Sequence, residues 1–100
     1  MPSNERSFRI ASATAADIAD LHALIAGLAD YEGLSEICVA TQHDLERALF
    51  GEFRCAEALI ARVDGDSQEA AGFALFFHTY STFLGRRSLW LEDLFVRPEY

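Results

Sequence analysis

Apolar and polar residues alternate along much of this chain, and the period of the alternation changes from one stretch to the next. Around Phe8 the period is two, which predicts a short strand at residues 7–12. From Ile18 to Leu28 apolar residues recur every three or four positions, which predicts an amphipathic helix that ends near Gly33. The chain is therefore expected to begin with a strand followed by a helix.

The rest of the chain reads as one more helix and three more strands. A capping pattern at Thr41 and Asp44 predicts a short helix that ends at Gly51. Three strand-like runs separated by turn residues follow at 56–63, 70–80 and 88–96. This order predicts a single domain over residues 1–100 of the α+β or α/β class. We expect a four-stranded antiparallel sheet with both helices on one face, because hairpin-like links join the last three strands.

The last predicted strand carries two adjacent carboxylates, Glu92 and Asp93, within an apolar run that we interpret as buried. Strict alternation of side chains places Leu91 and Asp93 on one face, and Trp90 and Glu92 on the other. An unpaired charge in such a setting is costly, so these acids need hydrogen-bond donors, a cationic ligand or a wet cleft. The alternative is an exposed strand edge or strand end, where both acids simply meet water.

The net charge and the two cysteines limit the classes of function that are open to the chain. Half of the 100 residues are hydrophobic (51%), as in globular proteins, and the formal net charge is −8. This balance argues against nucleic-acid binding and suits a cationic small substrate. Cys38 and Cys55 lack metal-ligand spacing and read as reduced thiols, so we expect a soluble cytoplasmic protein with no metal site and no membrane association.

The sequence from Leu91 to Tyr100 resembles the fourth strand of the GNAT-superfamily N-acetyltransferases. The acidic pair is similar to that of the diamine (spermidine/spermine) branch, and Tyr31-Glu32 matches a pair that lines the polyamine site there. The resemblance implies the N-terminal part of a GNAT fold, ending just before the Gly-rich loop that holds the acetyl-CoA pyrophosphate. In that superfamily a third helix and later strands cover the other face of the sheet, so we expect this face to be apolar and to favour self-association as a homodimer.

The same resemblance implies roles in acetyl transfer from acetyl-CoA, the co-substrate, to an amine. Glu92 is expected to take a proton from the attacking amine, while Asp93 and Glu32 hold its other positive charges and Tyr31 forms a wall. The backbone of the fourth strand, at Leu94, Phe95 and Val96, is expected to bond the pantetheine amides. The family's usual acid for the departing thiolate is a tyrosine well beyond position 100.

Phe83 marks a departure from the branch. It lies in a predicted loop at 79–85, at a place where diamine acetyltransferases usually carry a tryptophan. An aromatic ring there is expected to contribute to substrate binding, although phenylalanine attracts a cation less strongly than tryptophan. This departure favours one alternative to a di- or polyamine acetyltransferase, namely a GNAT enzyme for another small amine, such as an amino acid, a lysine analogue or an antibiotic. A separate alternative is a non-catalytic half-fold that serves for dimerisation or binding.

Overall fold

The computed structural model describes residues 6–100 and confirms the predicted order of helices and strands. Two short 3-10 turns, η1 and η2, accompany the regular elements. In chain order the elements are β1 (Phe8–Ser12), η1 (Ala15–Asp17), α1 (Ile18–Tyr31), η2 (Ser35–Ile37), α2 (Gln42–Phe50), β2 (Glu57–Val63), β3 (Ala70–Ser81) and β4 (Arg86–Val96).

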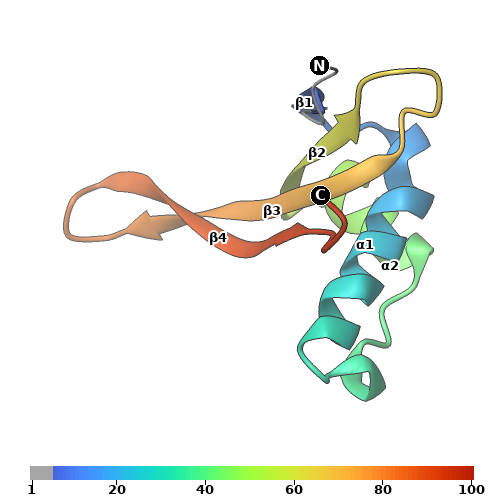
Figure 1. The fold of residues 1–100 in the computed structure, drawn as a ribbon. Helices are drawn as coiled ribbons and strands as arrows, with labels where there is room; N and C mark the ends of the chain where they lie inside the picture. Colours follow the sequence, from blue (N-terminus) through green and yellow to red (C-terminus); the bar gives the residue numbers. More distant parts are fainter. Residues whose placement is uncertain (1–5) are drawn as a thin grey trace.

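The four strands form one sheet in the order β1-β2-β3-β4, and each neighbouring pair is antiparallel, as predicted. The β3–β4 hairpin is long and projects well beyond the two helices (Figure 1). Strand β3 continues to Ser81, so the expected loop at 79–85 is shorter than predicted. Cross-strand pairing from Ser81 with Arg86 onward keeps these residues in the sheet.

A Thr-x-x-Asp capping box precedes each helix, and the box before α2 is the one expected from the sequence. At α2 the Thr41 hydroxyl accepts from the Asp44 backbone N–H at 3.1 Å, and the Asp44 carboxylate accepts from the Thr41 N–H at 2.9 Å. At the first cap the Asp17 carboxylate accepts from the Thr14 backbone N–H at 2.7 Å, and the chain makes one 3-10 turn before α1. Within residues 6–100, no helix has the length and apolar character needed to cross a membrane.

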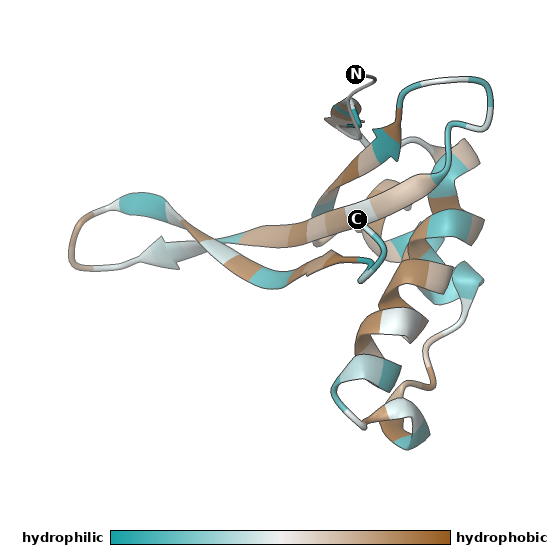
Figure 2. Cartoon of the chain, in the orientation of Figure 1, coloured by the Kyte–Doolittle hydropathy of each residue, from teal (hydrophilic) through white to brown (hydrophobic). Residues whose placement is uncertain are grey.

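The core lies between the helices and one face of the sheet. Leu21 and Leu24 of α1 are almost completely buried, with 1% and 0% of their surface exposed. The strand pairing aligns Ile60, Phe73 and Phe95 across the sheet, and all three are buried against the helices. Apolar residues run through both layers (Figure 2). Both helices therefore cover the same face, as predicted.

The opposite face of the sheet is apolar and open among the described residues. Its exposed side chains include Ile10 (67%), Leu94 (66%) and Val96 (55%). Together with Leu59 and neighbouring small residues they line a shallow groove of about 240 Å³. This matches the expectation of an apolar face, which favours association with another apolar surface.

The expectation that the last strand is buried is wrong for most of its length. Of the residues of β4 only Phe95 is buried. Two features of the fold explain this. β4 lies at the edge of the sheet, and the first half of the strand extends past the helices.

Ion pairs of Arg62 link strand β2 to the start of α1. Its guanidinium donates to the carboxylates of Asp17 and Asp20, both at 2.7 Å, and the Arg62 and Asp17 side chains are only 18% and 16% exposed. Burial raises the pKa of Asp17, but hydrogen bonds from Thr14 and Arg62 outweigh it, so the pKa is lowered overall. Asp17 therefore contributes stability above the ordinary carboxyl pKa, and this stability is lost as the pH falls.

Replacing Arg62 by methionine (Arg62→Met) is expected to lower the free energy of unfolding by about 2 kcal/mol at neutral pH. This value lies between those of exposed and buried ion pairs, and the loss leaves two carboxylates without their cation. The effect should shrink below about pH 4, where the acids are protonated. Denaturant unfolding at neutral pH and below pH 4 measures the loss and its dependence on pH. Arg54→Met is the control, because the Arg54–Glu57 pair is exposed (59% and 42%) and should matter little. Equal losses in the two variants would contradict the assignment.

Candidate functional site

The candidate site is built around a β-bulge in the middle of β4. Leu75 of β3 pairs with Asp93, but the next residue, Phe76, pairs with Leu91, so Glu92 is an extra residue on β4. A bulge of this kind bends the strand and changes where its side chains point. The local geometry of the two carboxylates is therefore set by the bulge.

The bulge corrects the prediction that each face of β4 carries one acid. Asp93 pairs with Leu75, which packs against the core, so Asp93 lies on the helix-covered face. Trp90 pairs with Phe77, two residues beyond Leu75 on the same face, and its indole Nε1–H donates to Glu92 Oε1 at 3.3 Å. Glu92 and Asp93 are consequently on the same side of the sheet. Leu91 and Asp93, expected to share a face, are on opposite faces because of the extra residue.

The electrostatics of Asp93 reflect this crowding. Partial burial raises the pKa of Asp93 first, and the negative charges of Glu92 and Glu32 raise it further. No cation offsets these effects among the groups that shift it. Glu32 and Glu92 therefore lie close enough to Asp93 to raise its pKa, although Glu32 comes from a distant segment of the chain.

Tyr31 and Glu32 are placed by the end of α1. Gly33 takes the left-handed conformation (φ 72°), and the Leu34 N–H donates to the Ala29 carbonyl at 2.7 Å, which ends the helix in a Schellman-like turn. Glu32 is thereby held at the C-terminus of α1, where its charge acts on Asp93. The Tyr31 ring is 74% exposed, with its centroid 6.4 Å from that of Phe95.

The segment between the helices is held against the N-terminal half of α1. The His22 Nε2 atom lies 2.8 Å from the Ala40 carbonyl oxygen, so the ring donates to the backbone of this segment. His22 thus has a structural partner. Gly27 contributes to the packing of α1 against β4, because a Cβ there would lie 3.4 Å from the Phe95 ring.

Leu94, Phe95 and Val96 lie on the edge strand. On one side their backbone pairs with Ala74, Phe73 and Gly72 of β3. Within residues 6–100 no strand pairs with the outer edge of β4. Backbone groups on this edge are therefore free to bond a ligand with amide groups.

Phe83 lies apart from the acids. It is at the tip of the β3–β4 hairpin with 99% of its surface exposed. Six residues of extended strand separate Arg86 from Glu92, which corresponds to about 20 Å. Within one chain, the structure brings Tyr31, Glu32, Glu92 and Asp93 into one region and leaves Phe83 outside it.

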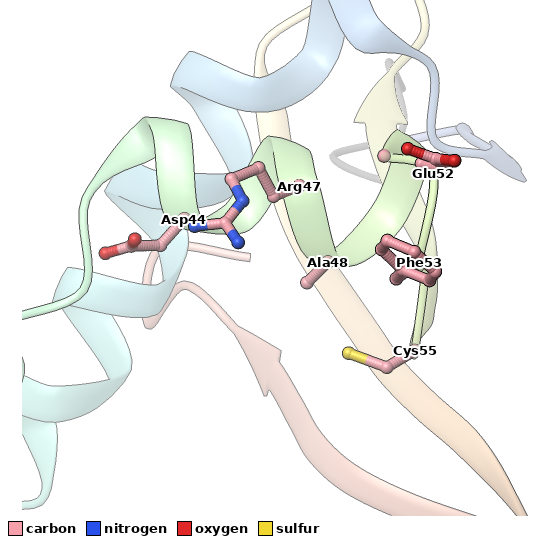
Figure 3. A pocket seen from close by; sticks show the side chains of 7 residues that line it. Asp44, Arg47, Ala48, Glu52, Phe53 and Cys55 are labelled. Atoms are coloured by element: carbon pink, nitrogen blue, oxygen red, sulfur yellow. The ribbon is translucent and has the colours of Figure 1, made fainter.

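Two cavities lie beside the helices, and neither is lined by Glu32, Glu92 or Asp93. A cavity of about 460 Å³ lies beside α2, between this helix and the segment that leads to β2 (Figure 3). Arg47, Phe53 and Cys55 are among its lining residues, and none of the predicted site residues is. A smaller cavity of about 290 Å³ between α1 and the end of β4 includes Tyr31 and Phe95. Among the described residues, no three potential metal ligands gather in one place.

Two features of the site escaped prediction. The bulge has no sequence signal other than the charged pair interrupting an apolar run. The Trp90–Glu92 hydrogen bond is compatible with their two-residue spacing, which placed them on one face, but spacing alone does not predict a contact.

Comparison with known proteins places the chain among acetyltransferases. It is 36% identical over 99 residues to a thialysine N-epsilon-acetyltransferase of Mus musculus, covering 94% of this chain and 58% of that protein. It is 33% identical over 97 residues to a spermidine/spermine N(1)-acetyltransferase-like protein of Homo sapiens, covering 93% of this chain and 14% of that protein. The chain thus spans little more than half the length of the mouse protein. No protein-family model matches it.

The solved structures agree at the level of the fold. The chain superposes on a ribosomal-protein-alanine N-acetyltransferase of Brucella melitensis biovar Abortus 2308 with a TM-score of 0.67 at 23% identity, covering 94% of this chain and 59% of that one. The match corresponds to the N-terminal half of the acetyltransferase fold. With the acidic pair on β4 and the sequence relatives described above, the chain belongs to the GNAT superfamily of N-acetyltransferases, and it resembles the diamine-acetyltransferase branch.

Proposed function

We propose that the protein to which residues 1–100 belong transfers the acetyl group of acetyl-CoA to a primary amine of a diamine or polyamine. The observation that carries the proposal is the set of three carboxylates, Glu32, Glu92 and Asp93, whose charges act together on Asp93. Within residues 6–100 none of the three forms an ion pair. A ligand with two or more ammonium groups supplies the missing positive charge.

Glu92 is the proposed base of the reaction. At neutral pH an aliphatic amine is almost entirely protonated, and it must lose a proton before its nitrogen can attack a carbonyl carbon. Glu92 accepts that proton, directly or through a water molecule. The C–N bond then forms as the C–S bond of the thioester breaks, and the sulfur leaves as the thiol of CoA once it is protonated.

The outer edge of β4 is the proposed site for the pantetheine arm of acetyl-CoA. The backbone of Leu94, Phe95 and Val96 runs along this edge directly after the acidic pair, and its groups that do not bond β3 face outward. Amide groups of the arm fit such an edge in the manner of an added strand. This arrangement brings an activated acetyl group beside Glu92.

The other two acids and Tyr31 are proposed to hold the rest of the amine. Asp93 and Glu32 bind the ammonium group that does not react, and the exposed Tyr31 ring forms a wall at the end of α1. The roles of Glu32 and Glu92 differ by position: Glu92 is in mid-strand beside the proposed thioester, and Glu32 ends a helix. Phe83 stays a candidate for substrate binding only through another chain, since about 20 Å of strand separates it from Glu92.

A lysine-type amino acid is the second candidate acceptor, because the most similar relatives include thialysine acetyltransferases. Such a ligand carries a carboxylate as well as two amines. The three acids without ion-pair partners repel a carboxylate, and this favours a diamine or polyamine.

The proposed setting is the cytoplasm, and the proposed assembly is a homodimer. Cys38 and Cys55 are both free thiols, in keeping with a reducing compartment. The exposed apolar residues on the open face and on the projecting hairpin support self-association.

A panel of acceptors tests the proposal directly. The complete protein with acetyl-CoA should release CoA with spermidine and putrescine at a higher kcat/KM than with thialysine or lysine, because only the former lack a carboxylate. Thiol release in a colorimetric assay measures this. Acetylation of thialysine in preference to every diamine would establish the second candidate, and no acetylation of any amine would contradict the proposal.

Substituting two acids separately distinguishes their roles. Glu92→Gln should lower kcat by about 100-fold or more, the usual size of a general-base effect. Glu32→Gln should mainly raise KM for the longer and more highly charged amines, because it removes binding that the ground and transition states share. Initial rates across the pH range provide the measurement. If Glu92→Gln keeps a normal kcat while its amine KM rises, Glu92 is only a charge anchor.

Asp93→Asn is expected to make the fold more stable at neutral pH. The folded state raises the pKa of Asp93, so its ionised form destabilises the fold above that pKa, and the penalty disappears as the pH falls below the ordinary carboxyl range. Thermal unfolding at neutral and acid pH should show a gain that shrinks on acidification. Spermidine should raise the melting temperature of the wild type more than that of the variant. A lower melting temperature for Asp93→Asn at neutral pH would contradict this account.

A further inference from the structure

The helix-covered face of the sheet continues past the core onto the projecting hairpin, and there it carries two aromatic rings. Phe77 of β3 pairs with Trp90 of β4, and their ring centroids are 6.4 Å apart with the planes 27° from parallel. Neither ring belongs to the core, which reaches only to Leu75 on this part of β3. Trp90 is 55% exposed, so the pair presents aromatic surface rather than core packing.

This aromatic pair lies next to the acids. The Trp90 indole N–H donates to Glu92 Oε1 at 3.3 Å, and Glu92 is followed on the same side by Asp93. Indole N–H is a donor only, so the bond requires an acceptor such as the carboxylate. A side chain at a bulge is otherwise less constrained by the ladder, and the hydrogen bond restricts where the Glu92 carboxylate can lie.

The combination of a carboxylate with an exposed aromatic surface suits one ligand chemistry. An ammonium group is attracted to carboxylates and to the faces of aromatic rings, tryptophan most strongly. The methylene chain of a diamine gains by covering the same rings, since this removes apolar surface from water. A short amine with one charge and one methyl group gains little from such a surface.

We propose that Trp90 is a positioning residue for Glu92 and that Trp90 and Phe77 together form the aromatic wall that selects amines with an aliphatic chain. The inference rests on the proposed function for the role of Glu92. It adds two residues that the resemblance does not assign, and it moves the aromatic part of the site within one chain from Phe83 to the middle of the hairpin.

Kinetics of the complete protein separate the two roles. Trp90→Phe keeps a ring and removes the N–H, so kcat should fall about tenfold or more, the effect of one hydrogen bond to a charged group, with a smaller change in amine KM. Phe77→Leu should raise the KM for spermidine about three- to tenfold and leave kcat nearly unchanged, because it removes aromatic surface without touching Glu92.

The matched control is Tyr80→Leu. Tyr80 is an exposed aromatic residue of the same strand, three positions from Phe77 and therefore on the other face. Its substitution should leave kcat and KM unchanged.

A double variant tests whether Trp90 acts through Glu92. If Trp90 acts through Glu92, Trp90→Phe should have no further effect on kcat in the Glu92→Gln background. Full additivity of the two effects would overturn the positioning role.

Amine binding without acetyl-CoA separates this inference from the proposed function. Trp90 is the only tryptophan of residues 1–100, so spermidine should change the tryptophan emission of the wild type in a saturable way. The change should be weakened in Phe77→Leu and kept in Tyr80→Leu, with methylamine at equal ionic strength as the negative control. If acetylation is absent but the fluorescence response to spermidine persists, the proposed function is wrong and the aromatic wall of Trp90 and Phe77 is supported. If acetylation is normal but Trp90→Phe and Phe77→Leu behave as Tyr80→Leu does, the inference is overturned.

Discussion

One extra residue in β4 decides how the chemistry of this protein is arranged. Backbone pairing between β3 and β4 is regular on both sides of Glu92, and the register shift at that point brings Glu92 and Asp93 to the same side of the sheet. Without the shift, alternation would send the two carboxylates to opposite faces. The mutual repulsion of the acids, the hydrogen bond from Trp90 and the influence of Glu32 on Asp93 all depend on this local change of register.

The fold supports the bulge from one side only. The helices pack against β2, β3 and the end of β4, and the buried Phe95 fixes the strand just beyond the acids. Toward the hairpin tip the strands have no helical cover, so Trp90 and Glu92 are exposed while their backbone is still held by the ladder. A rigid sheet thus presents accessible side chains, and this combination suits a binding site better than a mobile loop would.

Among the described residues, the carboxylates near the bulge of β4 lie close together without a cation beside them. Partial burial and the charges of Glu92 and Glu32 destabilise the ionised form of Asp93, and within residues 6–100 none of the three acids has an ion-pair partner. At Arg62, by contrast, one guanidinium lies 2.7 Å from each of two carboxylates. A partly buried acid without a nearby cation is in keeping with the proposed binding of a cationic ligand.

The sequence by itself determined the order of the elements, the antiparallel sheet, the shared helix face and the capping of α2, because hydrophobic period, turn residues and capping pairs act locally. It also identified the acidic pair and Tyr31-Glu32, through their resemblance to a known family. The bulge, the exposure of β4 and the distance of Phe83 from the acids were decided by the tertiary structure. Register is set by pairing between strands, and exposure by which elements cover a strand. Neither is encoded in the residues of β4 alone.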